Sequence, residues 1–166
     1  MEIPNGKGRM IMIVVSSCLA GLLCRYDGGH CLVDKIEQLV KEKKAVKVCP
    51  EVMGGLSTPR EPAEVIGGDG RDVLFGKAKV MTQSGKDVTA EYVAGAYRAL
   101  ERAKKVNASI IVLKESSPSC GSQIIYDGTF SSEKIAGEGV TTALLKREGF
   151  NVISERQFLG LLEEEN

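Results

Sequence analysis

The sequence lacks features that mark several common classes of protein. Its 22 basic and 22 acidic side chains leave no formal net charge, which argues against binding nucleic acid through a broad basic face. No apolar run approaches the roughly eighteen residues of a membrane span, and the first ten residues contain no apolar signal core. We therefore expect a cytoplasmic protein that has no membrane segment and no bulk nucleic acid as its partner.

Motifs for common cofactors are also missing. The glycine pairs do not form the G-x-G-x-x-G of dinucleotide-binding folds, and no glycine-rich loop carries the lysine typical of nucleotide triphosphatases. Structural zinc is usually held by paired C-x₂-C motifs, of which this sequence has none, and its one histidine is His30. Nicotinamide and nucleotide triphosphate cofactors therefore have no support, and a closed zinc site is disfavoured.

Cysteine and glycine are instead well represented, with five and 19 residues respectively among 166. A chain of this length can build its core without disulfides, and five is an odd number, so a complete disulfide framework is a poor interpretation. In a reducing cytoplasm, cysteines more often remain thiols, act in catalysis or bind metals.

Apolar runs that alternate with amphipathic stretches predict the fold class. Runs rich in β-branched residues predict buried parallel strands over 11–15, 45–48, 109–113 and 151–154. Helical periodicity predicts helices over 32–43, 87–106, 139–149 and 157–164. This alternation predicts an α/β protein with an open, mainly parallel sheet that is covered by helices on both faces.

The remaining segments are expected to be loops and hairpins. Residues 52–85 are rich in glycine and predict a long loop with an inserted β-hairpin. Residues 124–130 predict a tight hairpin that turns at Asp127-Gly128. We expect a single α/β domain over residues 10–166, preceded by a flexible extension over residues 1–9.

Three of the predicted strands run directly into a loop that contains a cysteine. Cys18 follows the first strand, Cys49 the second and Cys120 the third. Because the carboxyl ends of parallel strands meet at one edge of a sheet, where ligands bind, we expect these thiols to lie together. The alternative is that each is a small buried hydrophobe, but all three lie among Ser, Gly and Pro rather than in apolar runs.

Three dispersed thiolates fit an iron–sulfur cluster better than a zinc ion, because the ligands of such clusters are almost all cysteine. Three protein ligands leave one iron with an open position, which would suit a soft sulfur donor. Cys24, six residues after Cys18, is either a fourth or replacement ligand or a packed thiol. Cys31 is expected to be structural.

Polar residues beside the cysteines are candidates for chemistry. Glu51 lies two residues after Cys49 and is either a general acid or base or a solvated loop residue. Ser117 lies three residues before Cys120 and either orients a ligand or caps a turn. Candidates for contacts to a planar ligand, with structural ion pairs as the alternative, are Arg25, Tyr26, Asp27 and Arg60.

Taken in order, these motifs resemble those of the thiouracil desulfidase family of bacteria and archaea, over residues 11–155. The motifs are Ser17-Cys18-Leu19 with Cys24-Arg25-Tyr26-Asp27-Gly28, Cys49-Pro50-Glu51 with Gly54-Gly55 and Pro59-Arg60, and Ser117-Pro118-Ser119-Cys120-Gly121. The resemblance implies a Rossmann-like, three-layer αβα domain with a [4Fe-4S] cluster on Cys18, Cys49 and Cys120. It also implies that Glu51 and Ser117 handle proton transfer and substrate orientation.

The activity that the resemblance implies is a non-redox hydrolysis. Sulfur would be removed from a small thiolated heterocycle such as 2-thiouracil, giving uracil and hydrosulfide. Two alternatives from other classes stay open: a non-catalytic iron–sulfur or zinc protein that senses or delivers sulfur, and a binding module whose thiols are structural.

Overall fold

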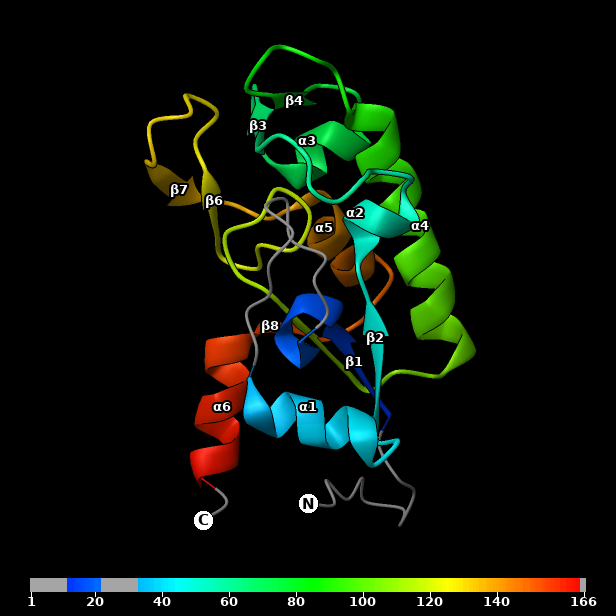
Figure 1. Cartoon of the computed structure of the whole chain (residues 1–166). Helices are drawn as coiled ribbons and strands as arrows, with labels where there is room; N and C mark the ends of the chain where they lie inside the picture. The colour runs from blue at the N-terminus through cyan, green and yellow to red at the C-terminus, as the bar shows by residue number, and fades with distance from the viewer. Residues whose placement is uncertain (1–11, 22–32, 165–166) are drawn as a thin grey trace.

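The computed structural model describes residues 12–21 and 33–164 (Figure 1). The expectations for the extension over residues 1–9 and for Cys31 lie outside these ranges. So do those for four site candidates, Cys24, Arg25, Tyr26 and Asp27. Within the described ranges, no helix combines the length and the apolar character that crossing a membrane requires.

A parallel sheet of four strands forms the centre of the fold. Its order is β2-β1-β5-β8, and every neighbouring pair is parallel. The strands are β1 (Ile13–Ser16), β2 (Ala45–Val48), β5 (Ile110–Leu113) and β8 (Val152–Ser154). The chain steps outward from β1 to β2 and then returns past β1 to β5, so the strand order reverses between β1 and β5.

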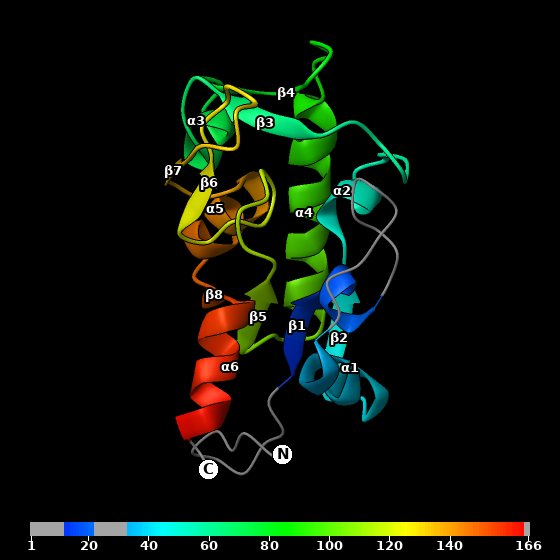
Figure 2. The same cartoon turned by 60° about the vertical axis from the view of Figure 1, so that its left-hand side comes forward.

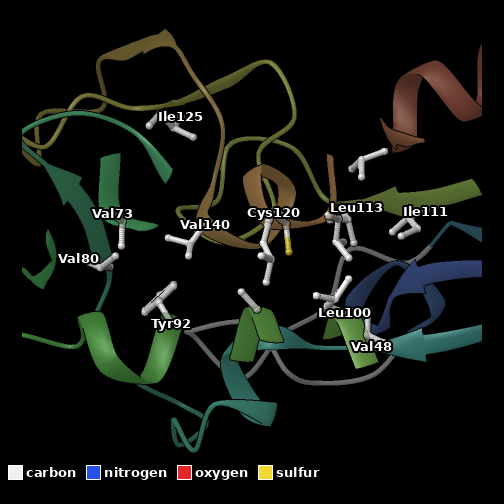
Figure 3. Close-up of a cluster of buried hydrophobic side chains, with 14 of the residues drawn as sticks. Val48, Val73, Val80, Tyr92, Leu100, Ile111, Leu113, Cys120, Ile125 and Val140 are labelled. Carbon is white, nitrogen blue, oxygen red and sulfur yellow. The ribbon is translucent and has the colours of Figure 1, made fainter. Parts of the chain in front are cut away.

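Helices cover both faces of this sheet (Figures 1 and 2), which confirms the predicted three-layer α/β class. Ile13 and Val15 of β1 belong to the cluster under α1 (Asp34–Lys41) and α6 (Glu155–Glu164). Val14 belongs to the opposite cluster, under α4 (Thr89–Lys105) and α5 (Val140–Arg147), part of which Figure 3 shows. Successive side chains of a strand point to opposite faces, so one apolar run serves both layers.

Smaller elements surround the carboxyl edge of the sheet. They are the 3₁₀ helix η1 (Ser17–Ala20), the helices α2 (Pro50–Met53) and α3 (Gly70–Leu74), and the strands β3 (Ala63–Ile66), β4 (Lys79–Thr82), β6 (Ile124–Tyr126) and β7 (Lys134–Ala136). β3 pairs with β4, and β6 pairs with β7, both antiparallel. The pair β3–β4 is the inserted hairpin that the sequence predicted.

The segment between β3 and β4 differs from its prediction, because it contains α3 rather than a simple loop. Asp69 caps this helix, and its side chain accepts from the backbone N–H of Arg71 at 3.0 Å. The Asp72 side chain accepts in turn from the backbone N–H of Asp69 at 2.9 Å. This reciprocal capping, with aspartate in place of the usual glutamate, was the signal for a helix start.

The prediction of a tight hairpin that turns at Asp127-Gly128 is wrong. β6 pairs with β7, and residues 127–133 form the loop between them. The Asp127 side chain accepts from the Thr129 backbone N–H at 2.9 Å, and the Gly128 N–H donates to Glu64 of β3 at 2.9 Å. Asp127 therefore forms a local turn with Thr129, and Gly128 binds Glu64 of β3. The two residues do not form the turn of a two-residue hairpin.

Candidate active site

The three cysteines at the strand ends line one cavity of about 410 Å³. Cys18 lies in η1, Cys49 lies between β2 and α2, and Cys120 lies in the loop between β5 and β6. All three are reduced thiols; Cys18 and Cys120 are buried, while Cys49 is half-buried. The parallel topology thus brings together residues from three separate segments, as the sequence predicted.

Ser117 shapes the loop that carries Cys120. Its hydroxyl oxygen accepts from the backbone N–H groups of Ser119 at 3.0 Å and of Cys120 at 2.8 Å, so it caps the turn. Ser117 also lines the cavity. A serine oxygen has two lone pairs, both of which these amides occupy, so its remaining capacity is one donated hydrogen bond.

Glu51 lies in α2 and is paired with Arg60 at the cavity wall. Arg60 Nε donates to Glu51 Oε2 at 3.0 Å, and Nη2 of the same guanidinium contacts the same oxygen. The two side chains are 15% and 9% exposed, so the ion pair is largely removed from water. Burial is the largest single influence and would lower the pKa of Arg60, but the charge of Glu51 and the hydrogen bond to it, with smaller contributions from Tyr92 and Cys49, together raise the pKa. Arg60 is thus positioned to hold Glu51 in place.

Tyr92 is a site residue that the sequence placed only on the apolar face of a helix. It is buried in α4 and lines the cavity beside Glu51. Burial, and then the charge of Glu51, raise the pKa of Tyr92 well above its ordinary value, so the hydroxyl stays protonated. A tyrosine at a core position needs a partner for its hydroxyl, which was the available signal.

Cys120 lies at the boundary between the cavity and the core, in the same cluster as Tyr92 (Figure 3). Burial, and then the nearby charge of Glu51, raise the pKa of the Cys120 thiol to about 12. The thiolate is therefore unfavourable without a cation. A bound metal would stabilise the thiolate form of this cysteine.

A second carboxylate organises the same loop. Glu115 Oε1 accepts from the backbone N–H groups of Ser122 at 2.8 Å, Gln123 at 3.0 Å and Ile124 at 3.1 Å. Burial alone would raise the pKa of Glu115, but these bonds and that from the Ser122 hydroxyl outweigh it, so the pKa is lowered. The loop that holds Ser117 and Cys120 therefore folds around a charged group.

The chemistry of the donor set fits an iron–sulfur cluster. The ligands of such clusters are almost all cysteine, and each thiolate binds its own iron atom, so the ligands lie around the cluster. Three thiols from three separate loops line one cavity of this protein, and they are the donor type that a cluster requires.

Fold and site together define an α/β protein in which a cysteine-lined cavity, suited to an iron–sulfur cluster, lies at the carboxyl edge of a parallel sheet. Comparison with known families agrees with this class and identifies the particular family. The sequence matches the 2-thiouracil desulfurase family over residues 13–157, and the chain belongs to that family.

Two similar proteins support this assignment. The chain is 60% identical to the uncharacterized protein YbbK of Bacillus subtilis (strain 168) over 151 residues, which are 91% of this chain and 100% of that protein. It is also similar to the solved structure of the [4Fe-4S]-dependent thiouracil desulfidase TudS, at 44% identity and a TM-score of 0.80. That match covers 93% of this chain and 97% of the other. The family and the Rossmann-like fold expected from the motifs are confirmed.

Proposed function

We propose that this chain is an enzyme that removes sulfur from a thiolated pyrimidine such as 2-thiouracil, giving uracil and hydrosulfide. The observation that carries the proposal is that Cys18, Cys49 and Cys120 line one cavity in a member of the 2-thiouracil desulfurase family. The similar [4Fe-4S]-dependent thiouracil desulfidase supports the same activity. The partner is then a small thiolated heterocycle, and the cytoplasm, where thiols stay reduced, is the location that this chemistry favours.

The proposed cofactor is a [4Fe-4S] cluster on Cys18, Cys49 and Cys120, with Cys24 as the alternative ligand. When bound, such a cluster supplies an open, thiophilic iron that can act as a Lewis acid toward sulfur. The half-buried Cys49 lines the same cavity as the two buried thiols, so three separate segments of the chain supply thiols to it.

Glu51 and Ser117 are the proposed catalytic residues. Glu51, held by Arg60, is placed to take a proton from a water molecule in the cavity. The Ser117 hydroxyl, whose oxygen already accepts two amides, is left to donate to an acceptor atom of the substrate. Arg25, Tyr26 and Asp27 are proposed as further substrate contacts, whereas Arg60 acts through Glu51.

The overall reaction needs no oxidant or reductant. Water supplies the oxygen that replaces sulfur on the ring carbon, so a C=S bond is exchanged for C=O. The two protons of that water leave with the sulfur as hydrogen sulfide or, after one ionises, as hydrosulfide and a proton.

Anaerobic reconstitution with iron and sulfide tests the proposal. The full chain should bind about four irons and four sulfides, as a [4Fe-4S] cluster requires, and should release hydrosulfide from 2-thiouracil. Cys18→Ala, Cys49→Ala and Cys120→Ala should each lose iron and activity. Cys31→Ala is the matched control and should keep both, while Cys24→Ala decides whether that thiol is a ligand.

The outcomes separate the alternatives. Hydrosulfide release by a Cys120→Ala protein that holds no iron would contradict the cluster mechanism. Iron or zinc without turnover of any thiolated base would favour a sulfur sensor or carrier. Protein that holds neither metal after anaerobic purification and reconstitution would favour a module with structural thiols.

A further inference from the structure

One wall of the cavity comes from a hairpin to which the proposed mechanism assigns no role. Phe130 in the loop 127–133, with Tyr126 at the end of β6 and Lys134 at the start of β7, lines the same cavity as the three cysteines. The hairpin and β3 lie side by side in both views (Figures 1 and 2). The cavity is thus closed on this side by a loop rather than by the sheet.

A buried carboxylate holds this loop in place. Glu64 of β3 is 8% exposed, and its Oε1 accepts from the backbone N–H groups of Gly128 at 2.9 Å and of Phe130 at 3.2 Å. Phe130 has φ +56°, in the left-handed region that an aromatic residue rarely adopts, so surrounding bonds must maintain it. Glu64 supplies one of these bonds directly to the strained residue.

Gly128 shows how closely the loop lies on β3. It has φ +91°, and a Cβ at this position would lie 2.7 Å from the carbonyl oxygen of Val65. Only glycine satisfies both the conformation and this approach. The loop backbone therefore rests on the strand that carries Glu64.

The aromatic residues of this wall suit a flat ring. Phe130 offers an apolar aromatic surface, and the Lys134 ammonium lies over the Tyr126 ring, 5.4 Å from its centroid. Flat heterocycles stack on aromatic side chains, and such stacking does not depend on a particular hydrogen-bond pattern.

We propose that Phe130 is a specificity-determining residue that stacks on the substrate ring, and that Glu64 is the positioning residue that holds Phe130 there. The inference rests on the proposed function, whose substrate is a planar thiolated heterocycle. It assigns the recognition of the ring to the hairpin, on elements separate from the three cysteine loops.

Substitutions at Phe130 test the stacking contact in the cluster-loaded enzyme. Phe130→Ala should raise the KM for 2-thiouracil about tenfold, the order expected for one lost stacking contact, with kcat and iron content nearly unchanged. Phe130→Tyr keeps an aromatic ring and should keep the KM. Phe75→Ala removes an aromatic ring that is 70% exposed and does not line the cavity, so it should behave as wild type.

Substitutions at Glu64 test the positioning role. Glu64→Ala should raise KM as Phe130→Ala does and should speed amide hydrogen exchange in residues 127–133 of the iron-loaded protein. Glu64→Gln keeps an oxygen that can accept both N–H bonds, so its KM and its exchange should stay near wild type. The double variant Glu64→Ala/Phe130→Ala should match Phe130→Ala alone, because Glu64 acts through Phe130.

The results distinguish this inference from the function on which it rests. If the iron-loaded wild type releases no hydrosulfide from 2-thiouracil, the proposed function fails and this inference fails with it. If wild type is active and Phe130→Ala has an unchanged KM, only the stacking assignment is overturned. Unchanged exchange of the loop amides in Glu64→Ala would overturn the role of Glu64.

Discussion

At the residue scale, the site depends on how Glu51 is held. Its carboxylate is paired with the guanidinium of Arg60, beside the buried Tyr92, and the ion pair is mostly shielded from water. A buried ion pair adds little net stability compared with apolar residues, but removing one partner leaves the other charge uncompensated. The two charges should therefore act as a unit in both stability and function.

Removal of Arg60 alone should destabilise the fold more than removal of the whole pair. Arg60→Met should lower the free energy of unfolding by about 3 kcal/mol, because Glu51 remains buried without its cation. The double variant Glu51→Leu/Arg60→Met should show a smaller decrease in the free energy of unfolding, because neither charge remains. Urea unfolding of the metal-free chain measures both, and an equal or larger loss in the double variant would contradict this account.

Removal of the Glu51 charge should slow the reaction without affecting the cofactor. Glu51→Gln keeps the size of the side chain but cannot take a proton, so kcat should fall about 100-fold or more. Iron content should stay at the wild-type level. Glu61→Gln is the control, since Glu61 also lines the cavity but its carboxylate is bonded to Ser84. A kcat unchanged by Glu51→Gln would exclude Glu51 as the general base.

At the scale of elements, the close crossing of α2 and α4 positions one side of the site. α2 begins directly after Cys49 and contains Glu51, and α4 contains Tyr92. A Cβ on Gly95 of α4 would lie 1.9 Å from the Pro50 carbonyl oxygen, so the two backbones touch. The positions of Glu51 and Tyr92 therefore depend on glycine at Gly95 and, on the other side of the crossing, at Gly54, where a Cβ would lie 2.0 Å from the Glu91 carbonyl oxygen.

Gly95→Ala should consequently be destabilising, although alanine favours helix by about 1 kcal/mol. We expect a net loss of about 2 kcal/mol from overpacking, with lower iron loading because α2 is displaced. Gly160→Ala in α6 is the matched control, because nothing lies within 4 Å of the added Cβ. The free energy of unfolding of Gly160→Ala should rise by about 0.5–1 kcal/mol. Equal thermal unfolding of the two variants would contradict the close crossing.

At the scale of the whole molecule, one parallel sheet and its two buried clusters support the segments that carry Cys18, Cys49 and Cys120. The carboxyl ends of β1, β2 and β5 carry the three cysteines, so the site is assembled from segments distant in the chain. The prediction of a single domain over residues 10–166 stays a prediction. The free energy of unfolding should nevertheless depend on the site loops, because Glu115 lies in one of them and lines the cavity.

The stability of the metal-free protein should depend on the charge of Glu115. Burial opposes its ionisation, but hydrogen bonds from Ser122, Gln123 and Ile124 lower its pKa below the ordinary 4.5. A group whose pKa is lower in the folded state stabilises the fold above its unfolded pKa, and this contribution is lost as the pH falls through the folded pKa. Stability should therefore decline below about pH 4.5.

Glu115→Gln is the variant that isolates this effect, because glutamine accepts hydrogen bonds but does not ionise in this range. Wild type should be the more stable protein at pH 7, and the difference should disappear toward pH 3. Urea unfolding at several pH values measures it. A constant difference between the two proteins would show that the charge of Glu115 makes no contribution.

Much of the fold and of the candidate site could be predicted because the relevant signals are local. The β-branched run of β1 and the periodicity of α4 predict their elements from neighbouring residues alone. Once the strands are taken as parallel, the positions of Cys18, Cys49 and Cys120 follow, because parallel strands end at the same edge. The motifs around these three cysteines then predict the family.

The sequence by itself thus determined the α/β class, the parallel sheet, the family and the meeting of the three cysteine loops. The tertiary structure alone decided that Arg60 holds Glu51 beside Tyr92, and that Asp127-Gly128 belongs to a longer loop. It also decided that Glu64 binds a loop 66 residues further along the chain. Strand and helix patterns are set by adjacent residues, whereas a buried polar group takes whichever partner the packed chain brings to it.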